Sequence, residues 1–430
     1  MKNQSKTSVL SHVVRSFDAT VLKGWYSSLG EMVHGSKRYY MTMGLFWLAI
    51  YASTLVALDA ISVGYHEAYG ATREIPWGIM ISTYIFFVVT STGLCIISAI
   101  GHIFGVKSLL PIGKRAVFLS IVTICSGFVV ILLEIENPFK MMLYNMITPN
   151  LTSNIWWMGT LYGAYMFFMI LEFAFLLLKW HRIAVFAGLI ALFSGIAAHS
   201  NLGAIFGMLH GREFWYGPYM PIYFIVSAMM SGCAAIIMFT WLAYKLNGKQ
   251  YDEPMKDAMV TLSKLTVLLI SIVLFFTVWK ILTGLVGAQG KVLTIQSFLF
   301  GSYAVNFWVF EVMIGMVIPL IMMLYSRGRK YGVMAFASAM MVVGIFVMRF
   351  DLVVLGQVVS VFHELGVNEY KGILSYTPSF HEWAIVIGAL SVTALTFLLG
   401  RRYSRAMSPT NTTDERNPKE ESDKCSLNSI

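Results

Sequence analysis

The sequence contains few charged residues for its length. Of its 430 residues, 12% are Asp, Glu, Lys or Arg, whereas 57% are apolar or aromatic. A soluble domain carries about 25% charged residues. The composition therefore excludes a soluble globular enzyme, a nucleic-acid-binding protein and a disordered chain. The apolar residues form long runs that, as helices, can cross a hydrocarbon core of about 30 Å. The sequence predicts an all-α polytopic membrane protein.

Cysteine and intramembrane histidine are also scarce. The chain has four Cys and no CxxC motif, which excludes a disulfide framework and makes an iron–sulfur cluster unexpected. Among its nine His, only His199 lies within an apolar run, and His102 lies at the end of another. A dihaem protein of the b type needs two axial His per haem, so we expect no intrinsic haem and no metal site.

Ten apolar runs predict about ten transmembrane helices within a membrane domain of residues 41–400. The runs are 41–64, 77–102, 114–134, 155–178, 183–207, 217–244, 258–284, 298–325, 331–356 and 382–400. Residues 1–40 predict a cytoplasmic or interfacial segment, because apolar residues recur at helical spacing between Leu10 and Trp25. A helix that docks on a partner is the alternative. Residues 401–430 are polar and predict a disordered cytoplasmic tail. The outer segment 357–381, which contains His363, Glu364 and Glu369, is a candidate contact loop for a partner.

The distribution of basic residues predicts the orientation. If the N-terminus is inside, 24 of the 31 Lys and Arg lie in inner loops and tails, and six lie outside. Basic residues collect on the cytoplasmic side of membrane proteins. We therefore expect both termini in the cytoplasm, and we attribute the net charge of +9 to this rule.

Six ionisable residues fall in the outer third of odd-numbered runs, if each run is a helix that rises about 1.5 Å per residue. Charge in hydrocarbon is costly, so each is a functional candidate. They are Asp59, Glu134, His199, Lys280, Arg349 and Asp351.

Structural roles are an alternative for several of them. Glu134 lies at the end of a run, and Lys280 can extend its amine to the surface. A lone His is often a packing residue. Arg349 and Asp351 are two positions apart and so lie on different helix faces.

Glu172 and Glu311 lie on even-numbered runs, at inner and middle depth. An isolated charge there is costly, so we expect both carboxyls to be neutral. Such groups can relay protons between the inner side and an outer site. A carboxyl that is hydrogen-bonded to a neighbouring helix is the structural alternative.

Five stretches occur in a recognisable order over residues 77–357. They are WGIMISTYIFFVVTSTGLCIISAIGHIFG (77–105), NPFKMMLYNMITPNLTSNIWWMGTLYG (137–163), HSNLGAIFGMLHGREFWYGPYMPIYFIVSAMMSG (199–232), FWVFEVMIGMVIP (307–319) and MRFDLVVLGQ (348–357). Together they resemble the polysulfide reductase membrane-subunit family of the NrfD/PsrC type, near its hydrogenase-2 branch. Two motifs depart from that family. Residues 134–138 read Glu-Ile-Glu-Asn-Pro where Asp-Leu-Gly-Arg-Pro is frequent, and 349–351 read Arg-Phe-Asp where Arg-x-Asn is common.

The resemblance implies two pseudo-symmetric four-helix bundles, formed by the second to fifth and the sixth to ninth runs, plus flanking helices. It implies a subunit of the bacterial cytoplasmic membrane that binds menaquinone or ubiquinone as a substrate and has no redox cofactor of its own. The implied partners are an iron–sulfur electron-transfer subunit and a catalytic subunit, in some members a molybdopterin protein, or a multihaem cytochrome. The chain alone would not convert the terminal substrate.

We expect the quinone headgroup in the first bundle, at His199 and Glu134, with Tyr84, Trp157 and Asp59 nearby. An imidazole exchanges protons near neutral pH, and a neighbouring carboxylate can pass them on. Glu172 and Glu311 are then the proton-transfer candidates, and Arg349 and Asp351 form a polar pair in the second bundle.

A secondary transporter is the alternative, because ten helices with intramembrane charges and a possible repeat also suit that class. Transporters often interrupt paired helices near the midplane. Here the 11 prolines lie mostly at the ends of runs or in loops, and Pro319 has no counterpart in the fourth run. The sequence favours the quinone-linked subunit.

Overall fold

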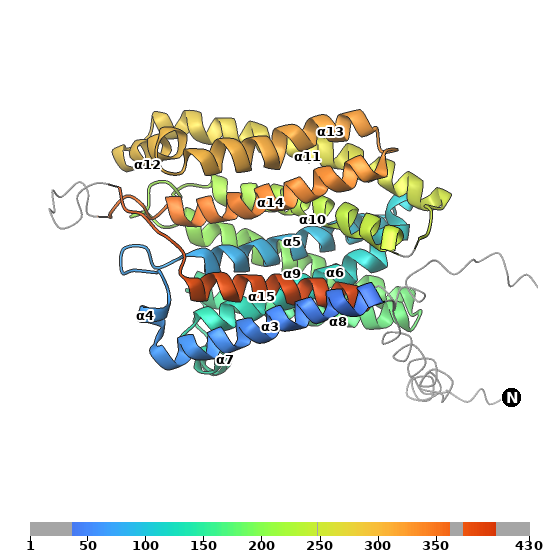
Figure 1. Ribbon diagram of the computed structural model, residues 1–430, viewed down its shortest axis with the longest axis horizontal. Coiled ribbons are helices and arrows are strands. Elements are labelled where there is room, and N and C mark those ends of the chain that lie inside the picture. Colours follow the sequence, from blue (N-terminus) through green and yellow to red (C-terminus); the bar gives the residue numbers. More distant parts are fainter. Residues whose placement is uncertain (1–36, 247, 362–372, 401–430) are drawn as a thin grey trace, which may run out of the picture. The chain divides into compact units, whose positions relative to one another are not determined.

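The computed structural model describes residues 37–246, 248–361 and 373–400 (Figure 1). Within these ranges the chain is helical, and its β-structure is a single bridge between Val359 and Ile373. Ten helices are long and apolar enough to span a membrane, which confirms the predicted all-α polytopic class. Residues 1–36 of the predicted N-terminal segment, the tail 401–430, and His363, Glu364 and Glu369 lie outside the described residues.

The helices follow the predicted runs closely. In chain order they are α3 (Lys37–Val63), α4 (Tyr65–Ala68), α5 (Ile79–His102), η1 (Lys107–Leu109), α6 (Leu110–Glu134), α7 (Pro138–Ile147), α8 (Asn154–Leu177), α9 (His181–Gly207), α10 (Tyr219–Leu246), α11 (Glu253–Leu285), α12 (Gln289–Phe300), η2 (Asn306–Val317), α13 (Ile318–Ser326), α14 (Tyr331–Leu355) and α15 (Phe380–Gly400).

The eighth predicted run, 298–325, began too early. The structure ends the short helix α12 at Phe300 and starts the spanning helix at Asn306. The turn at Gly301 is tight, because a Cβ there would lie 2.7 Å from the Ser297 carbonyl oxygen. The residues on both sides of the turn are apolar, so hydropathy alone does not reveal it.

The eighth span is itself irregular. Its first part, η2, is a π-helix, and α13 continues it from Ile318 with Pro319 in the first turn. Pro319 has no N–H and so cannot bond to the carbonyl four residues earlier. π-helical segments are rare and are frequent at functional sites. Glu311, a predicted site residue, lies in this segment.

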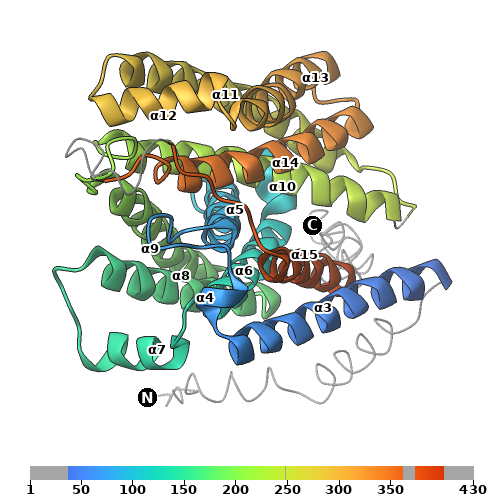
Figure 2. The ribbon, with the colours of Figure 1, turned by 60° about the vertical axis from the view of Figure 1, so that its left-hand side comes forward.

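Helix α5 occupies the centre of the packed helices, with α6, α9, α10 and α14 around it (Figures 1 and 2). Small residues allow this close packing. A Cβ at Gly93 would lie 1.9 Å from the Ala228 carbonyl oxygen of α10, and one at Gly232 would lie 2.3 Å from the carbonyl carbon of Gly93. By contrast, α3 lies at the edge and is largely exposed.

The helix contacts do not separate into two isolated bundles. Helices α5, α6, α8 and α9 contact one another, and so do α10, α11, η2, α13 and α14. The contacts of α5 with α10 and α14 join the two sets along their length. A symmetry relation between the sets stays a prediction.

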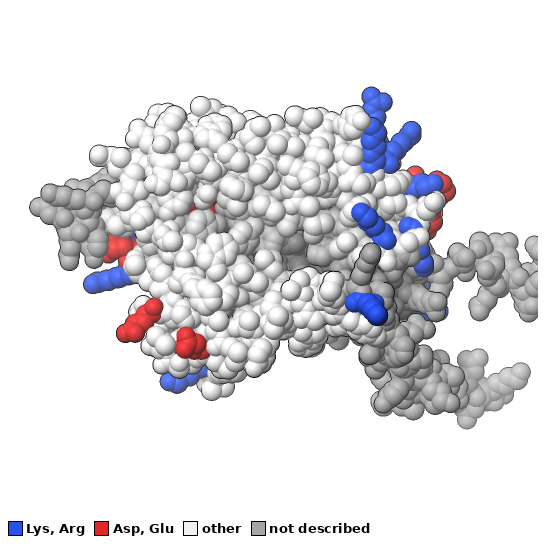
Figure 3. Space-filling model, in the orientation of Figure 1, with Lys and Arg blue, Asp and Glu red and all other residues white. Residues whose placement is uncertain are grey.

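Charged side chains gather at the two ends of the helices. Figure 3 shows Lys and Arg at the right-hand end, which is the end where α10 and α13 terminate, and a nearly uncharged surface between the ends. This arrangement is expected of a protein with a lipid-facing belt and a basic inner side.

The predicted topology can be tested with reporter fusions. A reporter fused after residue 110 should lie inside, and one fused after residue 365 should lie outside. The spans from α6 to α14 lie between the two positions and are odd in number, and the positive-inside rule predicts that the basic ends face the cytoplasm. Activity of an inside-only and an outside-only reporter at both positions measures this. A result on the same side for both positions would contradict the helix count.

Candidate functional site

His199 lies at a fully buried position of α9. Its Nδ1 lies 3.1 Å from the hydroxyl oxygen of Tyr162 on α8, and its ring packs 5.8 Å from that of Phe224 on α10. Its Nε2 is buried and has no hydrogen-bond partner among the described residues. A buried ring nitrogen without a partner is costly unless something binds it. The imidazole is therefore hydrogen-bonded at Nδ1, and its Nε2 can form a hydrogen bond with a ligand.

Arg349 of α14 is also fully buried. One Nη donates to the hydroxyl of Ser227 at 2.7 Å, and the guanidinium lies 5.2 Å from the ring centre of Phe224. Its Nε and Nη1 have no partner in the described part of the chain. The guanidinium interacts electrostatically with His199. We call Tyr162, His199, Phe224, Ser227 and Arg349 the His199 group.

A second set of buried charges adjoins this group. Glu311 of η2 interacts electrostatically with Arg349 and with Lys280 of α11. The Lys280 amine lies over the rings of three aromatic residues, the nearest being Phe298 at 5.1 Å. Asp351 accepts a hydrogen bond from Asn306 at 3.1 Å. Two buried basic side chains thus lie near two buried carboxyls in the interior.

The structure distributes the predicted Arg349–Asp351 pair differently. Arg349 donates to Ser227 on α10, whereas Asp351 accepts from Asn306 at the start of η2. Each hydrogen bond therefore joins α14 to a different helix. The cause is the two-residue spacing, which points the side chains to different faces. Arg349 consequently reaches α10 and the neighbourhood of His199.

Aromatic side chains cover the His199 group toward the predicted outer side. The rings of Phe206 and Phe224 stack at 5.8 Å, Phe206 contacts Trp215 at 5.0 Å, and Trp215 stacks on Trp77 at 5.6 Å. Trp215 also donates its indole N–H to the Leu352 carbonyl at 2.7 Å. These four rings come from α9, α10 and two loops. We call Phe206, Phe224, Trp215 and Trp77 the aromatic cap.

Arg212 links the loops of this cap by hydrogen bonds. Its guanidinium donates to the carbonyls of Gln357 and Val359, both at 3.1 Å, and to that of Glu74 at 2.9 Å. The guanidinium thereby links the loop of Arg212 to the loop of Glu74 and to the segment after α14.

A series of buried polar groups leads from the His199 group toward the inner side along one face of α8. Tyr162 and Tyr165 have ring centres 6.4 Å apart, and the Tyr165 hydroxyl lies 2.9 Å from the Ser91 oxygen and 2.6 Å from the Ser120 oxygen. Glu172 interacts electrostatically with Tyr165. Gly188 of α9 makes room for the Glu172 carboxyl, since a Cβ there would lie 2.8 Å from its carbon.

The predicted headgroup residues do not all have contacts with the His199 group. Tyr84 is buried and interacts electrostatically with Tyr162. Trp157 donates its indole N–H to the Leu151 carbonyl at 2.9 Å. Asp59 is exposed and lies 3.0 Å from the Nε2 of His381 on α15. Tyr84 thus interacts with a member of the His199 group. Trp157 and Asp59 interact with other residues.

Glu134 belongs to a carboxyl cluster around the start of α15. It interacts electrostatically with Glu382. Glu382 accepts from the amides of Gly70 and Ser379, at 3.0 and 2.8 Å, and from the Tyr376 hydroxyl at 2.5 Å. The Glu382 carboxyl thereby joins the 64–78 loop to α15. One Glu134 oxygen is buried and has no hydrogen-bond partner among the described residues.

Sequence reasoning missed Tyr162, Tyr165 and Ser227, because uncharged hydroxyl residues are common in apolar helices. A signal was present in α8, where Tyr162, Tyr165, Met169 and Glu172 recur at helical spacing and share its buried face. Ser227 could not have been found in this way, since its role depends on the crossing of α10 and α14.

The described residues contain no group of three or more His, Cys, Asp or Glu that could hold a metal ion. What the site offers is one imidazole nitrogen, guanidinium N–H donors and a tyrosine hydroxyl, inside an apolar surround. Such groups can bind a carbonyl or hydroxyl oxygen and exchange a proton with it.

Comparison with known proteins gives the family of the chain. The family model "Polysulphide reductase, NrfD" matches residues 67–361. A selenate reductase subunit of Mesobacillus selenatarsenatis is 24% identical over 75% of this chain and 84% of that protein. The Hdr-like menaquinol oxidoreductase integral membrane subunit of Archaeoglobus fulgidus is 26% identical, over 77% and 85%. A putative dimethyl sulfoxide reductase membrane subunit of Halobacterium salinarum is 26% identical, over 84% and 91%.

The family match extends over more than half of the chain and includes every spanning helix from α5 to α14. The chain is a multi-pass integral membrane protein and belongs to the NrfD family of polysulphide reductase membrane subunits.

Proposed function

We propose that this chain is the quinone-reactive membrane subunit of a respiratory oxidoreductase and exchanges electrons between the membrane quinone pool and an iron–sulfur partner subunit. The observation that carries the proposal is that buried His199 and buried Arg349 both lie against the ring of Phe224, at 5.8 and 5.2 Å, and both have nitrogen atoms without a partner among the described residues. One relative is named as a menaquinol oxidoreductase subunit and two others as reductase subunits. These names favour a quinone-linked complex over the transporter alternative.

The free nitrogen atoms suit a quinone headgroup. His199 Nε2, Arg349 Nε and Arg349 Nη1 are buried and have no partner among the described residues. A quinone carbonyl accepts hydrogen bonds, so its oxygen would satisfy these otherwise costly groups. The apolar rings of the cap suit the rest of the molecule.

Each residue of the group then has a chemical task. A bound quinone supplies the two-electron redox chemistry. His199 holds or releases the proton at Nε2, and the Tyr162 hydroxyl at Nδ1 fixes the orientation of the ring. Arg349 supplies a fixed positive charge that stabilises negative charge on a ligand oxygen. The aromatic cap excludes water and strengthens both interactions.

Protons would reach His199 from the inner side along α8. Tyr165, Ser91 and Ser120 form a hydrogen-bonded cluster, and Glu172 is the inner end of the series. Tyr165 and Glu172 are about seven positions apart, a rise of about 10 Å. That length exceeds one hydrogen bond, so this step of the route requires water or movement of Glu172.

The remaining predicted residues stay predictions. Glu134, Trp157 and Asp59 are outer candidates for contact with the quinone or for proton exit, although their closest contacts are with other residues. Glu311 is a proton-transfer candidate that also interacts electrostatically with Lys280 and Arg349.

The partners follow from the same chemistry. A subunit without its own redox centre must pass electrons to a bound protein that has one. We propose an iron–sulfur subunit for this step, followed by a catalytic subunit or a multihaem cytochrome, in the bacterial cytoplasmic membrane.

Replacement of His199 by Ala should reduce quinone-linked turnover by about 100-fold or more, the order expected for loss of an acid–base group. The complex should still assemble and should still react with an artificial electron carrier. Steady-state assays with a soluble quinol analogue and with the carrier measure both activities.

Two variants control this experiment. Tyr162→Phe removes one hydrogen bond to the ring and should give a smaller loss, because one such bond contributes about 1 kcal/mol. His66→Ala removes an exposed histidine of α4 and should leave turnover unchanged. Normal quinone kinetics in His199→Ala would refute the proposed site.

Glu172→Gln should assemble normally and should slow turnover, because a neutral amide of the same size cannot carry a proton. Proton uptake by vesicles that contain the complex, followed with a pH-sensitive dye on each side, measures the route. Unchanged turnover and unchanged uptake would make Glu172 a structural residue.

The absence of a haem is a separate prediction. The reduced-minus-oxidised spectrum of the purified chain should be flat in the haem region, since the sequence offers one well-buried His and no cysteine cluster. A stoichiometric b-type signal would overturn the proposed role as a cofactor-free subunit.

A further inference from the structure

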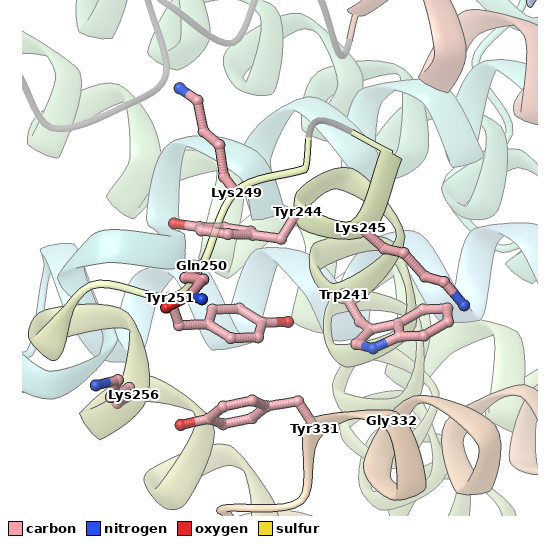
Figure 4. Close-up of a pocket in the computed structure, with 9 residues that line it drawn as sticks. All are labelled: Trp241, Tyr244, Lys245, Lys249, Gln250, Tyr251, Lys256, Tyr331 and Gly332. Carbon is pink, nitrogen blue, oxygen red and sulfur yellow. The ribbon is translucent and has the colours of Figure 1, made fainter.

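A basic, aromatic pocket lies at the opposite end of the helices from the aromatic cap. It has a volume of about 410 Å³ and is formed mainly by the end of α10 and the turn into α11, with the start of α14 as one wall (Figure 4). Along α10, Tyr223 and Trp241 are about 18 positions apart, a rise of about 27 Å. The pocket is therefore separate from the His199 group.

Three tyrosine rings form the inside of this pocket. Tyr244 stacks on Tyr251 with ring centres 4.4 Å apart, and Tyr251 contacts Tyr331 at 4.3 Å. Figure 4 shows the three rings one above another, with Trp241 to one side. The stack joins α10, the turn and α14, so the pocket has a fixed wall.

Two hydrogen-bond donors are buried behind and within the stack. The Arg115 guanidinium of α6 lies 5.6 Å from the Tyr244 ring centre. Arg115 Nη1 and the Tyr251 hydroxyl are buried and have no hydrogen-bond partner among the described residues. Burial raises the pKa of the Tyr251 hydroxyl above its ordinary value, so the hydroxyl keeps its proton. Donors of this kind bind phosphate oxygens.

Lysines surround the opening. Lys245 and Lys249 are exposed, and the Lys245 amine lies 4.4 Å from the Trp241 ring centre. Lys256 pairs with Glu253 at 2.7 Å. Lys245 and Lys249 are therefore the lysines whose charge we expect to attract an anion. The pocket combines cationic donors with aromatic walls at the end of spanning helices, the level at which lipid phosphates and interfacial Trp residues lie.

We propose that this pocket binds the phosphodiester of an anionic phospholipid from the leaflet at this end of the helices. Lys245 and Lys249 attract the phosphate, the Tyr251 hydroxyl donates to its oxygens, and Trp241 packs against the glycerol region. Arg115 does not line the pocket and adds positive charge from behind the Tyr244 ring. Basic pockets between spanning helices on the cytoplasmic side recognise such headgroups. A lipid is favoured over a soluble anion because the pocket lies at the ends of candidate spanning helices, where headgroups are expected.

Native mass spectrometry of the full-length chain can test this site. The chain is released from bilayers of equal parts phosphatidylglycerol and phosphatidylcholine, and retained lipids are counted. The wild-type chain should retain phosphatidylglycerol selectively. The Lys245→Gln/Lys249→Gln variant should retain about tenfold less, given what each basic residue contributes at an anionic surface. Tyr251→Phe, which removes only a hydroxyl, should also lose retention without loss of fold.

A charge-matched control is available at the same end of the helices. Lys179→Gln/Arg182→Gln removes two positive charges between α8 and α9 and should retain phosphatidylglycerol like the wild type. Equal retention by the pocket variant and this control would overturn the proposal. Displacement of the lipid by inorganic phosphate would overturn it too, since it would identify a soluble-anion site.

Discussion

The buried charge of Arg349 constrains the whole middle of the molecule. Transfer of an ion from water to a protein interior costs several kcal/mol unless partners compensate it. Ser227 accepts from the guanidinium, the ring of Phe224 faces it, and the Glu311 carboxyl interacts with it electrostatically. These partners lie on α10 and η2. The close contact of Gly315 with Gly344, where a Cβ would lie 2.2 Å from the opposing Cα, is what brings η2 near enough to α14.

The same constraint shapes the proposed chemistry. A guanidinium that is already fixed and desolvated need not reorganise when charge develops on a ligand, and its effect is larger than in water. The aromatic cap and the Arg212 contacts maintain that apolar surround from the outer side. A site of this kind needs a proton supply that does not open it to water, and the hydroxyl cluster of Tyr165, Ser91 and Ser120 has that property.

The sequence predicted the positions of single helices well. It did not predict which side chains of different helices contact one another. Hydropathy located nine spans within a few residues and failed at Gly301, where apolar residues continue through a turn. Depth along a helix singled out His199 and Arg349, and both proved fully buried. Their neighbourhood was not predictable, because it depends on the crossing of α5 and α10 at Gly93 and Gly232. The approach of Arg349 to His199 across the two helix sets was not expected for the same reason.

The two ends of the molecule join the helix sets in different ways. At the cap end, Arg212 and Trp215 connect loops from both sets through direct hydrogen bonds. At the basic end, Arg115 of α6 meets the tyrosine stack of α10, the turn and α14 through a ring contact, with donors still unpaired among the described residues. An anionic ligand there would interact with Arg115 of one set and with the lysines of the other, and so would link the two sets. Because it binds only the packed arrangement, its binding free energy would add to the stability of that arrangement. The geometry of the His199 group, built across the same two sets, would then depend in part on the lipid at the far end.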